Sequence, residues 1–177
     1  VALTSDYTFR GVSQTDEKPA IQGGFDLGFD SGFYLGTWSS NVNFGDGTSQ
    51  ELDLYAGYAF DINDSFSLDF GAVYFIYPNE GDALNYWEFM VNASIGDLGL
   101  GLVYSPEYFG DGGPDAFILS ADYSFALGEN FGLDFHLGYS DADEDNFFGT
   151  DNSYVDYSVG VSTSFMALDW SLAWVGA

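Results

Sequence analysis

Carboxylates are the side chains best able to do chemistry in this sequence. Asp and Glu together number 28, against two Lys and Arg, which gives a formal net charge of −26. Nucleic acid is excluded as a partner, because phosphate binding needs clustered Lys and Arg. Many of the acids lie in loops, as expected for a solvated acidic surface, but a second set recurs within alternating apolar and polar segments. A solvated surface does not explain acids within predicted strands, so we interpret this second set as functional.

Successive side chains of a β-strand point to opposite faces, so residues two apart share a face. The acids on the polar faces of the predicted strands, with the two basic residues beside them, are predicted to line a lumen: Asp6, Arg10, Asp26, Asp53, Asp69, Glu88, Asp122, Asp134, His136, Asp156 and Asp169. Carboxylates crowded in a confined space repel one another and draw in cations. Rings of acids favour cations in pores.

Catalysis and metal binding have little support. The chain has no cysteine, and therefore no disulfide or thiolate chemistry. His136 is the only histidine and no G-x-S-x-G motif occurs, so we predict no enzyme and no catalytic residue. The loop acids Asp141, Asp143 and Asp145 could hold Ca²⁺ or Mg²⁺, but they lack the spacing and glycine of an EF-hand. An exposed acidic loop is the preferred interpretation, and no other cofactor is predicted.

Alternating apolar and polar residues predict an all-β chain of about eleven strands. The first, Leu3 to Gln14, would place Leu3, Tyr7 and Phe9 on its apolar face and Arg10 on its polar face. The other predicted strands span residues 21–29, 32–44, 51–62, 66–77, 86–96, 98–104, 116–127, 131–140, 154–165 and 168–177.

The connections between these strands alternate between long and short. All four prolines fall in the long ones, and Pro78 opens one such loop, which ends at Asn85. Short turns at one end and long loops at the other are typical of outer-membrane barrels. Most predicted strands also have the roughly 9–11 residues that a tilted membrane strand needs. We therefore predict an antiparallel up-and-down transmembrane β-barrel with lipid against its apolar faces. A soluble β-sandwich, in which those faces pack together, is the alternative.

Bacterial single-chain barrels close with an even number of strands. An eleventh strand would end on the side opposite the start of the chain, so about twelve strands are expected. We interpret residues 1–177 as a single barrel domain that lacks its final C-terminal strand, unless the count is wrong by one.

Three segments carry a resemblance to a known family: LTSDYTFRGVSQT from Leu3, KPAIQGGFD from Lys18 and SGFYLGTWSSNV from Ser31. They resemble the proteobacterial TorF porin family, also called Gcw_chp. The resemblance is close over the first quarter of the chain and implies a membrane β-barrel in the bacterial outer membrane. Such barrels end in a strand with a terminal aromatic residue, which this chain lacks.

Two functional hypotheses remain open. In the first, the chain forms a narrow, cation-preferring pore for small polar solutes. In the second, the lumen is closed by acids hydrogen-bonded to Tyr, Ser and Arg10, and the protein is a structural or assembly-forming barrel. The expected partners are outer-membrane lipid and lipopolysaccharide, with divalent ions bridging loop acids to phosphates. A homo-oligomer could form through a free sheet edge.

Overall fold

The computed structural model describes residues 1–78 and 83–177, and its regular elements there are all β-strands. The predicted loop from Pro78 to Asn85 lies partly outside these residues. The strands of the main sheet are β1 (Ala2–Thr4), β4 (Ala20–Gly28), β5 (Phe33–Asn41), β6 (Gln50–Asn63), β7 (Phe66–Ile76), β8 (Tyr86–Ile95), β9 (Leu98–Ser105), β10 (Ala116–Leu127), β11 (Phe131–Ala142), β12 (Ser153–Phe165) and β13 (Leu168–Gly176). No helix within the described residues is long and apolar enough to cross a membrane.

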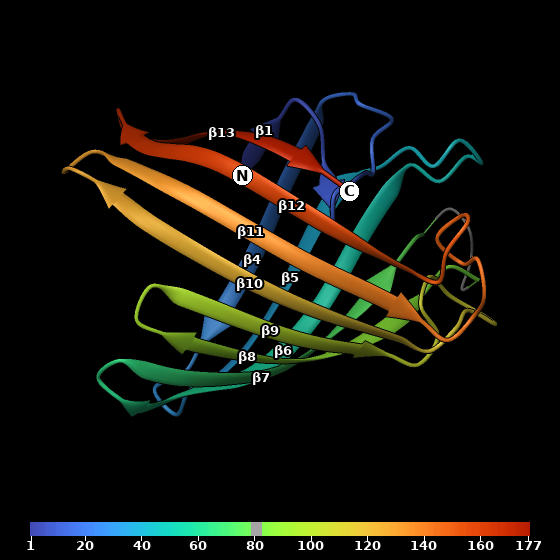
Figure 1. Cartoon of the computed structure of the whole chain (residues 1–177), viewed down its shortest axis with the longest axis horizontal. Helices are drawn as coiled ribbons and strands as arrows, with labels where there is room; N and C mark the ends of the chain where they lie inside the picture. The colour runs from blue at the N-terminus through green and yellow to red at the C-terminus, as the bar shows by residue number, and fades with distance from the viewer. Residues whose placement is uncertain (79–82) are drawn as a thin grey trace.

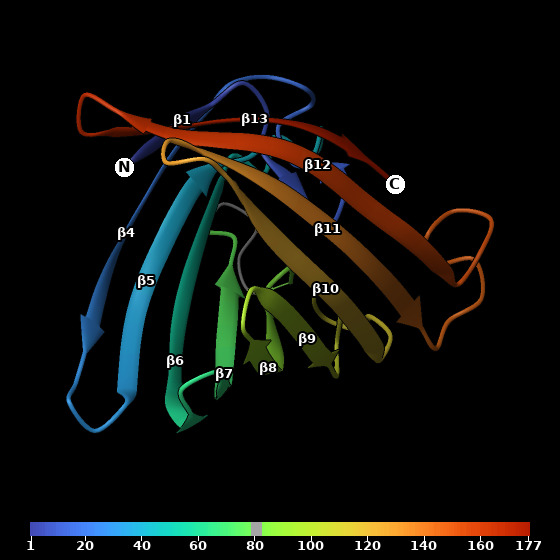
Figure 2. The same cartoon turned by 60° about the vertical axis from the view of Figure 1, so that its left-hand side comes forward.

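These eleven strands form one antiparallel sheet in which each strand pairs with its neighbour in the chain order. The sheet curls into a barrel until β13 lies beside β1 (Figures 1 and 2). β1 pairs with β4 and β13 pairs with β12, and no ladder joins β1 to β13 in the described part of the chain. The predicted up-and-down barrel is confirmed, and the alternative of two packed sheets is wrong.

Long and short connections alternate as predicted, so the barrel has a long-loop end and a short-turn end (Figure 1). The short turns follow β4, β6, β8, β10 and β12. At the last of these, Met166 and Ala167 both have a positive φ, of 54° and 59°. Two consecutive residues in that conformation build a two-residue hairpin turn whose twist suits antiparallel strands.

Apolar side chains cover the outside of the barrel, because the strand alternation places most of them on one face. Phe25 on β4 is 63% exposed and Leu172 on β13 is 80% exposed. The residues that alternate with them along each strand point inward and line the lumen. The outer surface therefore has the apolar character that a bilayer covers.

The predicted first strand, Leu3 to Gln14, is wrong. Only Ala2–Thr4 joins the sheet, and the chain then enters the barrel as a small hairpin of β2 (Thr8–Phe9) and β3 (Val12–Ser13). We call residues 6–15 the inner hairpin segment. Its turn residues Arg10 and Gly11 have φ values of 49° and 79°, as a two-residue hairpin turn requires. The chain reverses direction here, but the alternation of apolar and polar residues in the sequence continues across the two-residue turn.

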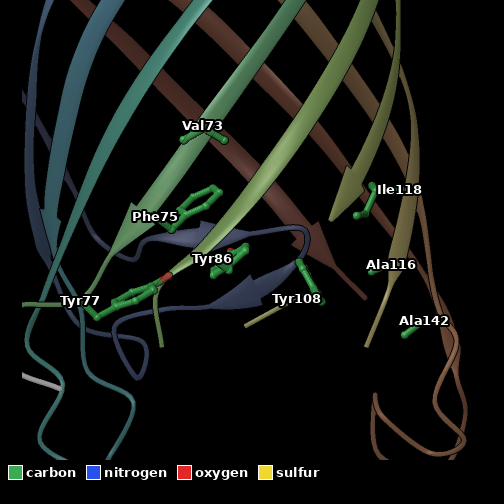
Figure 3. Close-up of a cluster of buried hydrophobic side chains, with 8 residues drawn as sticks. All are labelled: Val73, Phe75, Tyr77, Tyr86, Tyr108, Ala116, Ile118 and Ala142. Atoms are coloured by element: carbon green, nitrogen blue, oxygen red, sulfur yellow. The ribbon is translucent and has the colours of Figure 1, made fainter. Parts of the chain in front are cut away.

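A buried apolar cluster lies inside the long-loop end of the barrel, next to the inner hairpin segment (Figure 3). Phe9 of the hairpin stacks edge-on against Phe75 of β7, with ring centroids 5.9 Å apart. Tyr7, like Phe9, was predicted to face outward but faces the lumen, where its ring packs 5.3 Å from that of Trp38. The lumen at this end therefore contains aromatic rings beside the predicted carboxylates.

Candidate functional site

The candidate site is the lumen, and Arg10 at the tip of the inner hairpin segment forms a buried ion pair within it. The Arg10 guanidinium donates two hydrogen bonds to the Glu88 carboxylate, from Nη1 at 2.6 Å and from Nη2 at 2.8 Å. Arg10 Nη1 also donates to the Tyr108 hydroxyl at 2.9 Å. The Arg10 and Glu88 side chains are 12% and 3% exposed, so this is a buried bidentate ion pair. Both residues were predicted to line the lumen.

Gly11 allows the hairpin tip to approach the barrel wall closely. A Cβ atom at this position would lie 2.8 Å from the Cβ of Asp156, 2.8 Å from the Cβ of Ala177 and 2.9 Å from the carbonyl oxygen of Gly176. Only glycine fits this space in this conformation without displacing its neighbours. The hairpin is therefore held by an ion pair on one side and by close backbone packing on the other.

Glu51 is a second buried carboxylate beside the hairpin, and it is absent from the predicted lumen set. It accepts hydrogen bonds from the Tyr7 hydroxyl at 2.7 Å and the Tyr77 hydroxyl at 2.6 Å. Burial, together with the Glu51 charge, raises the pKa of both tyrosines, which keeps them protonated as donors. Asp53 lies two residues after Glu51, on the same face of β6. Its side chain is buried, with the residue 8% exposed, and its Oδ1 has no hydrogen-bond partner among the described residues.

His136 lies between two carboxylates in the middle of the lumen wall. Its Nδ1 is 2.7 Å from Asp122 and its Nε2 is 3.0 Å from Asp156. The register explains the contacts, because Asp122 is the direct partner of His136 on β10, and Asp156 on β12 lies close by. An imidazole that donates from both nitrogens is a cation. The predicted lumen residues Asp122, His136 and Asp156 are thus brought together.

The short-turn half of the lumen holds four more of the predicted acids. Each of the four accepts hydrogen bonds from neutral side chains: Asp26 from Tyr55, Asp69 from Tyr34 and Asn92, Asp134 from Ser124 and Ser162, and Asp169 from Ser164. None of these four has a cationic partner among the described residues. They form a carboxylate surface without compensating positive charge.

Two groups of predicted site residues lie apart from this lumen surface. Asp6 lies at the base of the inner hairpin segment, where its Oδ1 accepts from Ser13 Oγ at 2.7 Å and Thr15 Oγ1 at 2.8 Å. The loop acids Asp143 and Asp145 are exposed, and Asp141 accepts from the Tyr139 hydroxyl at 3.2 Å. Within the described residues, no group of three or more acids or histidines is arranged to hold a metal ion.

Sequence reasoning missed three residues that contact the inner hairpin segment or its partners at the long-loop end. Glu51 had a signal, because it shares its strand face with Asp53. Tyr77 also had one, since the run AVYFIY over residues 72–77 is apolar on both faces and thus indicates that something packs inside the barrel. Tyr108 had none, because it lies in a long loop whose path the alternation does not determine.

The charged side chains that face the lumen are unevenly paired. Arg10 is neutralised by Glu88, and His136 faces two carboxylates, so neither leaves an unpaired positive charge for an anion. The remaining carboxylates are paired only with hydroxyl or amide donors, or with none. In a confined, low-dielectric space such charges are weakly screened and raise the local concentration of counter-ions.

Comparisons with solved structures show the fold. The chain is similar to the KdgM porin, with a TM-score of 0.64 at 15% identity over 89% of this chain and 84% of that one. A KdgM porin in complex with disordered oligogalacturonate gives a TM-score of 0.61 at 14% identity, with the same coverage. The NanC porin gives 0.61 at 11% identity over 82% of this chain and 74% of that one. No curated protein matches the chain.

The family comparison covers the whole chain. The family described as "Bacterial protein of unknown function (Gcw_chp)" matches residues 1–177. The resemblance in the first quarter of the sequence therefore extends to its end. This porin-like antiparallel β-barrel belongs to the Gcw_chp family.

Proposed function

We propose that the protein is a narrow channel of the bacterial outer membrane that prefers small cations and polar solutes to anions. The observation that carries this proposal is the charge on the lumen wall. Its carboxylates are opposed only by Arg10 and His136 among the described inward-facing residues, and both of these face carboxylates. Carboxylates that line a pore favour cations.

The width of the lumen supports a low conductance. Barrels of about eight strands fill with side chains, whereas those of 16 or more hold open channels. Here the sheet has eleven strands, and the inner hairpin segment occupies part of the long-loop end. In the short-turn half, the Tyr34 side chain fills the space beside Gly57 and Gly71 and narrows the lumen further. Solutes would therefore have to pass beside the hairpin.

The KdgM porin, whose fold is similar, was solved in complex with disordered oligogalacturonate, a chain of acidic sugars. We do not extend that substrate to this chain. A polyanion entering a lumen lined by uncompensated carboxylates would be repelled, and the lumen offers no unpaired Arg or Lys among the described residues to receive it. A barrel of this fold could instead admit a positively charged solute.

A closed structural barrel is the second candidate, and the inner hairpin segment favours it. The hairpin is anchored by the Arg10–Glu88 pair and packs into an aromatic cluster, and most lumen acids have a hydrogen-bond donor. A barrel whose lumen is sealed at one end would serve membrane structure or assembly rather than transport. No catalytic role is proposed for His136, whose ring nitrogens both face carboxylates.

Single-channel recording in planar bilayers under a KCl gradient tests the proposal. We expect small conductance steps and a reversal potential of the sign set by K⁺. A variant with Asp26, Asp69 and Asp134 changed to Asn should move the reversal potential towards zero. The matched control changes the exposed turn residues Asp64 and Asp97 to Asn and should leave it unchanged. Anion preference would overturn the proposal. Folded, inserted protein without conductance would favour the closed barrel.

A further inference from the structure

Two adjoining cavities open at the long-loop end, one aromatic and one acidic. The aromatic cavity has a volume of about 450 Å³, and its ring-bearing residues come from the inner hairpin segment, two long loops and the start of β12: Phe9, Tyr108, Phe109, Phe147, Phe148 and Tyr154. The acidic cavity, of about 680 Å³, is lined partly by Asp16, Glu17 and Asp46. Val12, Gln14 and Phe109 line both cavities, so the two are adjacent.

The rings of the aromatic cavity form a connected wall. Phe148 packs against Tyr154 with centroids 4.7 Å apart and against Phe147 at 5.1 Å. Tyr108 packs against Phe109 at 4.4 Å. Two of these residues already face a cation, since the Arg10 guanidinium lies 4.4 Å from the Phe9 ring centroid and 5.5 Å from that of Tyr108. Aromatic faces attract cations through the ring quadrupole.

The acidic cavity supplies charge that is largely uncompensated. Asp16 pairs with Lys18 at 2.7 Å, but both side chains are about two-thirds exposed, so this pair is weak. Glu17 and Asp46 have no ion-pair partner among the described residues. Asp46 Oδ1 accepts the backbone N–H of Thr48 at 2.9 Å, and this hydrogen bond lowers the Asp46 pKa and keeps the carboxylate charged.

We infer that these adjoining cavities bind a small organic cation, an ammonium compound with an apolar or aromatic body. The rings would contact the body and the faces of the cationic group, and Glu17 and Asp46 would supply the countercharge. This inference rests on the proposed function and names the solute class that such a channel would admit. The aromatic cavity lies within the range of about 300–1,000 Å³ typical of small-molecule sites.

Other occupants fit the two cavities less well. An anionic solute would meet the carboxylates of the acidic cavity. A hydrated metal ion would gain nothing from the apolar bodies of Phe147 and Phe148, and the described residues hold no metal-binding group of three or more acids or histidines. A neutral apolar molecule would contact the aromatic rings but would not interact with the carboxylates. It is therefore the informative control.

Binding to the protein in dodecyl maltoside micelles, a detergent without a quaternary ammonium group, tests the inference by calorimetry. The probes are benzyltrimethylammonium, benzyl alcohol and benzenesulfonate, which share a ring and differ in charge. We expect the cation to bind, the alcohol to bind more weakly and the sulfonate not to bind. Equal binding of cation and alcohol, or no binding of the cation, would overturn the inference.

Variants locate the site. Phe148→Leu keeps an apolar side chain but removes the ring, and should weaken binding of the cation about three- to five-fold. Phe165→Leu, on the outer surface at the opposite end, is the matched control and should change nothing. Asp46→Asn should weaken binding about two- to five-fold at low salt, against Asp64→Asn as control. If Phe148→Leu does not fold, the exposed Asp46 variant decides, and unchanged binding in it would count against the site.

Binding in micelles requires no conduction, so the two proposals can fail separately. Cation binding that depends on Phe148 and Asp46, in a protein without cation-selective conductance, would support the site and contradict the channel. Cation-selective conductance without binding of benzyltrimethylammonium would support the channel and overturn the site.

Discussion

Arg10 shows how single residues organise the inside of this barrel. Its backbone has a φ of 49°, a conformation that costs a non-glycine residue about 1–2 kcal/mol. Its guanidinium is also removed from water, which is costly for an unpaired charge. Both costs are offset, because Glu88 accepts hydrogen bonds from Nη1 and Nη2 of Arg10 and the Tyr108 hydroxyl accepts one from Nη1. The position of Arg10 thus depends on its partner rather than on its own preference.

Glu88→Gln should destabilise the protein, because it leaves the Arg10 charge buried without a counter-ion. Removing one partner of a buried ion pair costs about 3–5 kcal/mol, and we expect a loss of free energy of unfolding in that range. Urea unfolding in detergent micelles, followed by tryptophan fluorescence, measures it. Asp64→Asn, which removes an exposed turn carboxylate, is the control and should leave the free energy of unfolding unchanged.

The double variant Arg10→Met/Glu88→Leu tests whether the loss of stability in Glu88→Gln comes from leaving Arg10 without its counter-ion. Replacing both members of a buried pair by apolar residues is often close to neutral. We therefore expect the double variant to be more stable than Glu88→Gln alone. A double variant that is less stable than either single variant would argue that the two residues act independently.

The alternation of apolar and polar residues predicts most of the strands. β10, at Ala116–Leu127, has the predicted bounds, because Pro114 precedes it and Gly128 follows it. The prediction of one strand from Leu3 to Gln14 is wrong for a specific reason. The reversal at Arg10–Gly11 takes two residues, so the alternation continues across it, and Arg-Gly lacks the Asn-Gly or Asp-Gly signature of such turns.

The candidate site was predictable to the same extent as the strands. Asp122 and His136 are direct ladder partners, because the short turn after β10 sets the register of β10 and β11. Asp156 joins them because β12 pairs regularly with β11 after the long loop between these two strands. The Arg10–Glu88 pair could be predicted only as two inward residues. Their contact depends on a loop that folds into the lumen, and no local pattern encodes that path.

Replacement of the inner hairpin segment should widen the channel. Thr4 on β1 and Ala20 on β4 are direct ladder partners, so an Asn-Gly turn can replace residues 5–19 without disturbing the sheet. We expect far-UV circular dichroism to stay that of a β-barrel and single-channel conductance to rise at least about two-fold, since conduction depends on the narrowest constriction. Unchanged conductance in the folded variant would mean that solutes do not pass the hairpin.

The whole molecule carries a charge of −26 in a barrel whose apolar outside suits a bilayer, and this sets how it meets a membrane surface. The long loops contain many exposed acids, with Lys18 as their only lysine, and that lysine already pairs with Asp16. An outer leaflet rich in lipid phosphates would repel such loops. Divalent ions that bridge carboxylates to phosphates would relieve the repulsion, because Mg²⁺ and Ca²⁺ prefer oxygen ligands from both.

Chelation of divalent ions should therefore lower thermal stability in lipopolysaccharide-containing bilayers. We expect the melting temperature to fall by roughly 2–4 °C for each kcal/mol of lost bridging. Changing Asp143 and Asp145 to Asn should reduce this fall, because these exposed loop acids would supply bridging carboxylates. The control is the same chelation in dodecyl maltoside micelles, which have no phosphate and should show no shift. An equal shift in micelles would place the ions within the protein rather than between its loops and the lipid.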